Sequence, residues 1–290
     1  MNVTTPSTDT AHAEIVRSVS ARSTPSTARI GQVPALRRSG ILAIMYREFL
    51  LLTRNRTNLL LAILPTAIYL LLFATSLTNL VGSVTYQGIT VGYAEFAIPA
   101  IMLSSMLAAT TTTGTSLFQE EMGGMAVELW SYPMSRAGYI SGKILATTGL
   151  VVAQSLAALL VGVLLFDLGW PLRNWIALGI GTVVVSLTFN GLYLLFASLV
   201  RDFQRFMVLI NVLGPFLLFS SPSFYPIEQM PDVLRWLSVV NPVTYGISCL
   251  RGGALFGWQT MWPTALGMLA AAFVLFAVIS VVLTRRVREL

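Results

Sequence analysis

The single lysine of the chain, Lys143, follows Gly142, and this pair comes nearest to a nucleotide-binding motif in the sequence. A phosphate-binding loop has the pattern G-x-x-x-x-G-K-[ST], because its backbone surrounds the phosphates and its hydroxyl holds Mg²⁺. Here Ile144 stands at the hydroxyl position and Ala137 at the position of the first glycine. We therefore predict that this chain does not bind or hydrolyse ATP itself.

Two residue types that often carry chemistry occur only once each, as His12 and Cys249. Zinc sites usually combine several Cys or His ligands, and an activated nucleophile needs a base beside it. We therefore predict no catalytic residue, no metal site and no cofactor bound by this chain. Cys249 is expected to be a small apolar side chain, and His12 lies in a polar N-terminal segment.

The composition indicates that lipid surrounds most of the chain. Hydrophobic residues make up 55% of the 290 residues and charged residues only 10%, whereas soluble domains carry about a quarter of charged residues. Six stretches without charge are long enough to cross a hydrocarbon core of about 30 Å. We predict an all-α integral membrane protein with six transmembrane helices, at about 58–81, 96–118, 144–166, 174–199, 206–225 and 261–284.

The segment before the first predicted span divides into two parts. Residues 1–36 are rich in Ser, Thr and Ala without apolar periodicity, which is typical of a disordered cytosolic tail. Residues 37–57 begin the transmembrane domain, which we assign to 37–290. Arg47, Arg54 and Arg56 punctuate this apolar stretch, which favours a helix in the membrane interface that contacts lipid phosphates. The alternative is a plain positively charged flank of the first span.

The positions of the basic residues predict the orientation in the membrane. With both termini in the cytosol, 15 of the 18 Lys and Arg residues lie in inside segments and 3 in outside segments. Cytosolic loops carry such an excess in membrane proteins. The net charge of +6 therefore indicates contact with anionic lipid and not with nucleic acid.

The sequence also limits how transport could be powered. No Asp, Glu, Lys, Arg or His lies within the predicted spans, whereas a proton-coupled transporter needs an ionisable group inside the membrane. Sodium coupling through neutral oxygens stays open, because residues 110–116 supply several hydroxyls. If the chain moves a solute uphill, we expect the energy to come from another polypeptide.

A polar segment, 119–143, joins the second and third predicted spans on the predicted cytosolic side. Glu120 and Glu121 near its start favour the positive end of a helix dipole, and Pro133 would end a short helix around residues 124–130. Such a helix lying across the cytosolic ends of two spans would serve as a lever. A solvated loop with a turn before Pro133 is the alternative, and both readings stay open on these residues.

A second segment, 224–260, faces outside in the predicted topology. It is too apolar for a solvated loop, and Pro226, Pro231 and Pro242 interrupt it too often for a span. Apolar residues recur at helical spacing around Leu234 and Leu237. We predict one or two short helices at the outer membrane edge before the sixth span.

These two segments carry a resemblance to the permeases of ABC-2-type exporters, in particular to daunorubicin-resistance permeases and their lipid-exporting relatives. The outer motif consists of Phe224-x-Pro226, Met230-Pro231, Asn241-Pro242-Val243-Thr244 and Leu250-Arg251. The inner motif consists of Glu120, Gly124, Leu129, Pro133 to Arg136 and Gly142-Lys143. One departure is that Val127 stands where the family often has an acidic residue, and Glu128 follows it.

The resemblance implies a half-transporter for an amphipathic drug, a lipid or a lipid-linked compound in the bacterial plasma membrane. It implies a dimer with a second permease copy or paralogue and two copies of a separate ATP-binding cassette subunit, which hold ATP and Mg²⁺. The interfacial helix and a coupling helix would contact that subunit. The implied coupling residues are Glu120, Glu121, Gly124, Glu128, Leu129, Pro133, Arg136 and Lys143.

Two further interpretations depend on the same residues. Thr110–Thr113, Asn190 and Asn211 are candidate polar groups along a translocation path, although intramembrane Asn residues also hold helices together. A membrane immunity or scaffold protein that sequesters a partner without transport is the alternative function.

Overall fold

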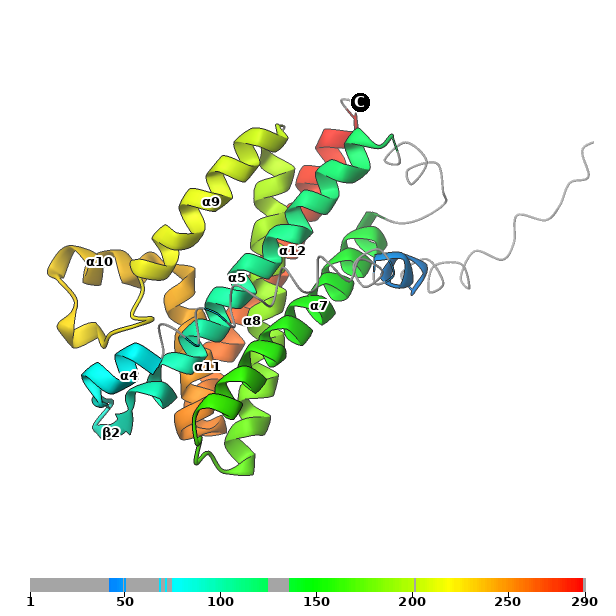
Figure 1. Cartoon of the computed structure of the whole chain (residues 1–290). Coiled ribbons are helices and arrows are strands. Elements are labelled where there is room, and N and C mark those ends of the chain that lie inside the picture. The colour runs from blue at the N-terminus through cyan, green and yellow to red at the C-terminus, as the bar shows by residue number, and fades with distance from the viewer. Residues whose placement is uncertain are drawn as a thin grey trace, which may run out of the picture. The chain divides into compact units, whose positions relative to one another are not determined.

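The computed structural model describes residues 42–48, 50, 68, 71, 75–124, 136–200 and 202–288, with the backbone alone at 136 and 284–288. The predicted tail at 1–36 and most of the predicted first span lie outside these residues. The named elements, drawn in Figure 1, are α4 (Thr75–Val81), β1 (Ser83–Tyr86), β2 (Ile89–Gly92), α5 (Tyr93–Met122), α7 (Arg136–Leu165), α8 (Leu172–Leu199), α9 (Phe203–Phe219), η2 (Ile227–Gln229), α10 (Asp232–Val240), α11 (Pro242–Phe256) and α12 (Trp258–Arg288).

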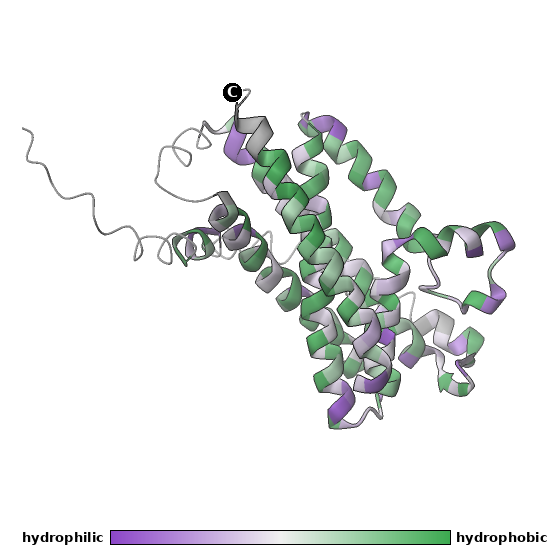
Figure 2. Cartoon of the chain, turned by 180° about the vertical axis from the view of Figure 1, so that it is seen from behind, coloured by the Kyte–Doolittle hydropathy of each residue, from purple (hydrophilic) through white to green (hydrophobic). Residues whose placement is uncertain are grey.

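In the part of the chain that the structure describes, four helices are long and apolar enough to cross a membrane. They comprise Tyr93–Met122, Ala137–Leu165, Leu172–Leu199 and Trp258–Leu283, and at about 1.5 Å per residue each exceeds 30 Å. Figure 2 shows hydrophobic residues along the length of these helices and hydrophilic residues gathered toward their ends. The predictions of helical spans at 96–118, 144–166, 174–199 and 261–284 are confirmed.

The fifth predicted span is shorter than expected. α9 has 17 residues and ends at Phe219, not at residue 225. Its length of about 25 Å falls short of a full hydrocarbon core. The helix ends because Ser220 and Ser221 lead into Pro222, and the residue before a proline is disfavoured in the α region. At the other end, Asp202 caps α9 by accepting a hydrogen bond from the backbone N–H of Arg205 at 2.7 Å.

The prediction that the chain is entirely helical is wrong at one place. β1 and β2 form an antiparallel hairpin in which Tyr86 pairs with Ile89. Gln87 and Gly88 in the two-residue turn both have positive φ, 49° and 83°, which is typical of a type I′ turn. The alternation of Val, Thr, Tyr and Ile residues suits a strand pair and is too short for a helix. Of the predicted span 58–81, the structure describes α4 and two single residues.

The helices pack around α8, which contacts α5, α7, α11 and α12. Gly253 of α11 lies so close to α8 that an added Cβ would stand 3.1 Å from the backbone nitrogen of Leu178. Close approach of this kind through small residues is how helices pack in lipid, where no hydrophobic effect drives association. The buried core therefore runs along the faces that α5, α8 and α11 share.

The two ends of the helices differ in what they carry. α5 and α8 end, and α7 and α9 begin, at one end, which we call the inner end because the Lys and Arg count predicts that it faces the cytosol (Figure 1). The hairpin, η2 and α10 lie toward the opposite, outer end. The prediction of short helices before the last span is confirmed, although the structure has three such elements, η2, α10 and α11, where one or two were expected. The orientation itself stays a prediction.

Candidate functional site

Ionisable side chains meet at the inner end, around Glu120 in the last turn of α5. Glu120 is buried, and its carboxylate accepts a hydrogen bond from the Arg47 guanidinium at 2.7 Å. The Lys143 ammonium of α7 lies 3.1 Å from the same carboxylate. The Tyr139 hydroxyl, one turn before Lys143, also donates to Glu120. One carboxylate thus joins α5 to α7 and to the helical residues 42–48.

A second carboxylate, Glu48, completes this group. It is 1% exposed and lies 3.1 Å from Arg47 and 3.5 Å from Lys143. Burial raises the pKa of Glu48, and the negative charge of Glu120 adds to this increase while Lys143 opposes it. We call Arg47, Glu48, Glu120, Tyr139 and Lys143 the inner charge cluster. With Tyr139 neutral and the other four side chains charged, it contains two cations and two anions.

The inner charge cluster ties three segments by interactions that are costly to break. Removing one partner of a buried ion pair costs about 3–5 kcal/mol, because the remaining charge is left without compensation. Lys143 is fully buried, so its charge depends on Glu48 and Glu120. A displacement of the helical residues 42–48 must therefore move α5 and α7 with them or expose buried charge.

The structure corrects the prediction that charged residues stay outside the spans. α5 continues to Met122 and α7 already begins at Arg136, so Glu120, Arg136 and Lys143 lie in helices and not in the predicted loop. The helices extend because Glu120 and Lys143 compensate each other's charge, which makes burial of both tolerable. The absence of ionisable residues holds for 96–118 and 144–166 but not for the longer helices α5 and α7 that contain these stretches.

The other predicted coupling residues are only partly described. Glu121 lies half-buried beside Glu120, and Gly124 has a positive φ of 71° just beyond α5. The predicted short helix before Pro133, with Glu128 and Leu129, lies outside the described residues. The same holds for Arg54, Arg56 and the side chain of Arg136.

Sequence reasoning missed Glu48 and Tyr139. A signal for Glu48 was present, because it is the single acidic residue in the segment 37–57. An acidic residue in a basic interfacial helix has little reason to face anionic lipid, and a partner elsewhere in the protein is the simplest account. Tyr139 gave no signal, since a tyrosine near a membrane boundary is ordinary.

At the outer end, Arg251 of α11 is buried without a carboxylate partner among the described residues. Its guanidinium donates to the backbone oxygens of Phe96 at 3.2 Å, Pro222 at 2.8 Å and Ser223 at 2.5 Å. It also lies over the Phe96 ring, 3.7 Å from the centroid. Arg251 was predicted in the outer motif, and the structure shows its buried guanidinium satisfied by three backbone carbonyls, which the fixed fork of arginine donors can reach together.

Asn241 links the same region to the end of α9. It caps α11 by accepting from the backbone N–H of Val243 at 2.9 Å, and it donates to the carbonyl oxygen of Leu217 at 2.6 Å. Pro242 occupies the first position of α11, where a missing N–H costs nothing. The remaining motif residues border the short helices: Pro226 precedes η2, Met230 is buried after it, and Pro231 precedes α10.

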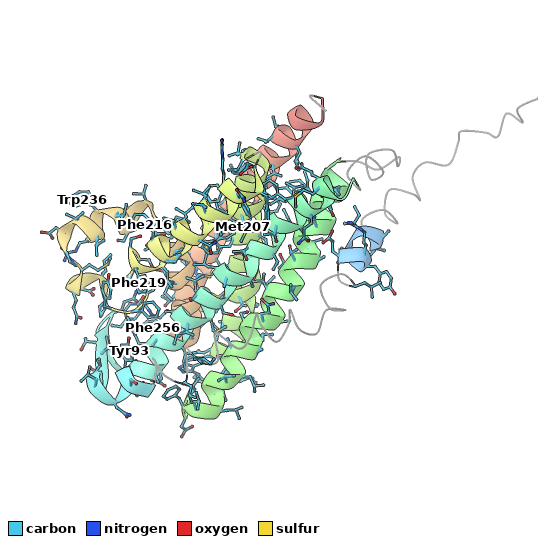
Figure 3. The ribbon with its side chains drawn as sticks, turned by 45° about the horizontal axis from the view of Figure 1, so that its top comes forward. Tyr93, Met207, Phe216, Phe219, Trp236 and Phe256 are labelled. Atoms are coloured by element: carbon cyan, nitrogen blue, oxygen red, sulfur yellow. The ribbon has the colours of Figure 1, made fainter. Side chains whose placement is uncertain are left out.

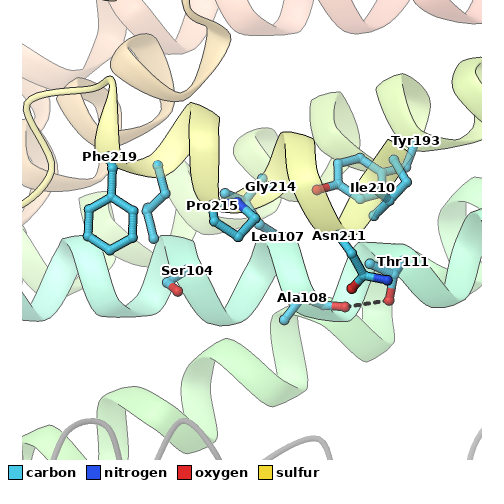
Figure 4. A pocket seen from close by; sticks show the side chains of 11 residues that line it. Ser104, Leu107, Ala108, Thr111, Tyr193, Ile210, Asn211, Gly214, Pro215 and Phe219 are labelled. Atoms are coloured by element: carbon cyan, nitrogen blue, oxygen red, sulfur yellow. Dashed lines mark hydrogen bonds between the residues drawn. The ribbon is translucent and has the colours of Figure 1, made fainter. Parts of the chain in front are cut away.

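A cavity of about 350 Å³ opens between α5, α8 and α9 (Figure 4). Its lining is mainly apolar, and its polar groups come from Ser104, Thr111, Tyr193 and Asn211. Thr111 satisfies its own hydroxyl by donating to the carbonyl oxygen of Ala108 at 2.7 Å. An apolar cavity with a few polar groups is suited to an amphipathic molecule.

The predicted polar groups of the translocation path separate into two sets. Asn190 is fully buried and joins helices, because it accepts from Thr113 of α5 and donates to Thr148 of α7 at 3.2 Å. This confirms the reading of Asn190 as a residue that holds helices together. Asn211 and Thr111, in contrast, line the cavity.

Comparison with known proteins identifies the family. Residues 39–255 match the ABC-2 type transporter family. The chain belongs to the ABC-2 type transporter family. It is 26% identical over 234 residues to the inner membrane transport permease YadH of Escherichia coli (strain K12), covering 79% of this chain and 89% of YadH.

Two other relatives of this ABC-2 protein match over shorter stretches. The probable doxorubicin resistance ABC transporter permease protein DrrC of Mycobacterium tuberculosis (strain ATCC 25618 / H37Rv) is 26% identical over 168 residues, which cover 55% of this chain and 58% of DrrC. The putative transport permease ycf38 of Cyanophora paradoxa is 24% identical over 212 residues, which cover 73% and 72%.

The family match and the four apolar helices make the chain a multi-pass protein of the bacterial inner membrane and a membrane subunit of a transporter. The matched residues contain both the inner charge cluster and the outer motif. The resemblance that these motifs predicted is confirmed.

Proposed function

We propose that this chain is the permease of an ATP-driven exporter that moves an amphipathic drug, a lipid or a lipid-linked compound out of the cytosol or the inner leaflet. Two copies of a separate ATP-binding cassette subunit would supply the energy. A second copy of this chain, or a paralogue, would complete the transmembrane pathway. No catalytic residue is required of this chain in that arrangement.

The inner charge cluster is the observation that carries this proposal. Because Arg47, Glu120 and Lys143 join the helical residues 42–48 to α5 and α7 through buried ion pairs, a push on the inner end reaches two membrane helices at once. The partner subunit would supply that push by contact with residues 37–57 and with the segment between α5 and α7. Its ATP and Mg²⁺ stay on the partner.

The cavity between α5, α8 and α9 supports the amphipathic class of substrate. Its polar groups come from all three helices, with Ser104 and Thr111 on α5, Tyr193 on α8 and Asn211 on α9, in a mainly apolar wall. Such a wall binds apolar surface by its area and orients a few polar atoms of the solute. A large hydrophilic solute would leave its own polar groups unpaired there.

The test uses the chain purified together with its cognate ATP-binding cassette subunit and reconstituted in inverted vesicles. Doxorubicin serves as the drug probe and a headgroup-labelled fluorescent phospholipid as the lipid probe. We expect one of the two to move into the vesicles with ATP, and to stay outside with a hydrolysis-deficient ATPase variant. Protein that associates with the ATPase but moves neither probe, and whose hydrolysis neither probe changes, would favour a scaffold or immunity role.

A further inference from the structure

α9 contacts α5 near its inner end and the residues Asn241 and Arg251 beyond its outer end, and a cavity lies along α9 between Ile210 and Phe219. The cavity is lined on α9 by Ile210, Asn211, Gly214, Pro215, Leu218 and Phe219. On the inner side of the cavity, Phe203 and Phe206 of α9 meet Phe118 of α5. Because Phe206 lies four residues before Ile210, this contact stands about 6 Å nearer the inner end than the cavity lining.

The inner contact includes three aromatic rings and depends on a glycine. Phe206 is fully buried, and its ring lies 5.2 Å from the ring of Phe118. Phe118 also lies 5.8 Å from the ring of Phe203. Gly114, one turn before Phe118, leaves the space that the tip of Phe206 fills, since an added Cβ would lie 2.2 Å from Cζ of Phe206. The Phe206 ring thus occupies a slot in α5 that any other residue at position 114 would close.

The outer contact is made of directed hydrogen bonds. Asn241 donates to the carbonyl oxygen of Leu217 at 2.6 Å and to the Ser220 hydroxyl at 3.0 Å. Arg251 holds the two following carbonyls, of Pro222 and Ser223. Moving the outer half of α9 would leave these buried groups unpaired, which is costly. Separating three phenyl rings leaves no polar group unpaired.

Between the two contacts, the backbone of α9 is interrupted. Pro215 lies inside the helix, and a proline there cannot donate to the carbonyl four residues earlier, that of Asn211, and displaces it sterically. Sharp bends in helices occur at such positions. Gly214 beside it adds backbone freedom. The inner half of α9 is therefore joined to the anchored outer half at the weakest turn of the helix.

We propose that Phe118, Phe203 and Phe206, seated at Gly114, form an aromatic gate that controls access from the inner end to the cavity between α5, α8 and α9. The gate opens when the inner half of α9 tilts about Pro215, while Asn241 and Arg251 keep the outer half in place. This proposal rests on the proposed function for its role in transport. The motion itself is measurable without a substrate.

Thiol labelling tests the gate directly, because Cys249 is the single cysteine of the chain and is buried. In a Cys249→Ala background, Leu107→Cys places a thiol in the cavity lining at a position that is buried. The full chain is placed in inverted membrane vesicles, so that its inner end faces the medium. A membrane-impermeant maleimide is then added to the medium. Gly114→Ala adds the Cβ that displaces Phe206, and Gly114→Ala with Phe206→Leu removes the ring atoms that it meets. Gly149→Ala is the matched control, since an added Cβ there has nothing within 4 Å.

We expect the thiol of Leu107→Cys to be labelled about tenfold faster in the Gly114→Ala variant than in the parent, which corresponds to a shift of about 1.4 kcal/mol toward the open gate. Phe206→Ala should do the same without introducing a clash, which covers the case that Gly114→Ala does not fold. The double variant with Phe206→Leu should return toward the parent rate, and Gly149→Ala should not change it. Equal rates in the parent, Gly114→Ala and Phe206→Ala would overturn the gate.

Transport separates this proposal from the proposed function. If these substitutions change labelling as expected but the reconstituted complex moves neither probe, the gate stands and the exporter role fails. If the complex transports while labelling is the same in all variants, the exporter role stands and the gate is wrong.

Discussion

The inner and outer ends of this protein both bury cations, but they compensate them in different ways. At the inner end, Arg47 and Lys143 meet the carboxylates of Glu48 and Glu120, so charge is balanced between side chains of three segments. At the outer end, Arg251 donates to three backbone carbonyls and lies on the Phe96 ring. Side-chain pairs can exchange partners as helices shift, whereas bonds to backbone fix one arrangement of the chain.

This difference suits the two ends to different roles in the proposed ATP-driven export. The inner charge cluster is suited to transmit movement, because each of its cations has two carboxylates within 3.5 Å. The outer end is suited to stay in place, because Arg251 and Asn241 donate hydrogen bonds to backbone oxygens near the end of α9. The chain continues from there into α10, which carries Trp236. Figure 3 shows Trp236 on α10 on the side away from α7, with Phe216 and Phe219 on α9 nearer the bundle.

The largest effect is expected at the outer end. Arg251→Met removes three buried hydrogen bonds at once, and each carbonyl left unpaired costs about 1–3 kcal/mol. Since small proteins are stable by about 5–15 kcal/mol, this variant should give little folded protein by fluorescence-detected size exclusion in detergent. Because its partners are backbone groups, no second side-chain substitution should rescue it. Yield and melting temperature equal to those of the natural chain would refute the outer anchor.

The inner end should respond to the same kind of change but allow rescue. Lys143→Met leaves Glu48 and Glu120 with one cation and should lower the free energy of unfolding by about 3–5 kcal/mol. Adding Glu48→Gln restores the charge balance around the remaining Arg47–Glu120 pair and should recover part of the loss. Thermal unfolding in detergent compares the three proteins. A double variant no more stable than Lys143→Met would contradict the balance of charges in the inner charge cluster.

A smaller effect separates the two roles of Asn241. Asn241→Ser keeps an uncharged acceptor that can cap α11 but loses the amide donor to the Leu217 and Ser220 oxygens, whereas Asn241→Ala loses both. A lost cap alone costs about 0.5–2 kcal/mol. We expect the melting temperature to fall from the natural chain to Asn241→Ser and further to Asn241→Ala. If the Ser and Ala variants are equally stable, the cap contributes nothing and the contact with α9 carries the effect.

The smallest effect is a dependence on pH at the inner end. Burial raises the pKa of Glu48 in the folded protein above its value in the unfolded chain. The folded state therefore takes up a proton more readily, so this residue destabilises the fold at neutral pH and the penalty fades as the pH falls toward the ordinary glutamate range. Relative to Glu48→Gln, the natural chain should gain melting temperature between pH 7.5 and pH 5. Parallel curves for the two proteins would show that Glu48 does not titrate in this way.

The sequence predicted the long helices well because each is a long stretch without charge, and it predicted the outer motif residues by their order. It misplaced the inner boundaries, since a charged residue was taken as the end of a span. Glu120 and Lys143 are buried because they compensate each other over 23 positions of sequence, and a window of local hydropathy does not contain both. The hairpin was missed because its strands have only four residues each.

The cavity and the aromatic gate could not be predicted at all. Both depend on the side-by-side placement of α5 and α9, and Gly114 and Phe206 are ordinary residues of apolar helices until the helices are brought together. Asn211 and Asn190 are the same residue type, and each lies in an apolar stretch of the sequence. Their roles differ because one faces the cavity and the other faces Thr113 and Thr148.

The central claim is that the inner charge cluster couples the ATPase to the membrane helices. The most direct test is the number of probe molecules transported per ATP hydrolysed by the reconstituted complex with Arg47→Met and Glu120→Gln together. This variant disconnects residues 42–48 from α5 and leaves Glu48 paired with Lys143. Asp202→Asn is the control, because it removes an inner-end carboxylate but keeps a side chain that caps helices.

We expect the double variant to hydrolyse ATP while transport per ATP falls about fivefold or more, as the loss of about 1 kcal/mol of coupling or more would give. The control should keep the natural ratio. A folded double variant that transports as many molecules per ATP as the natural complex would contradict the account.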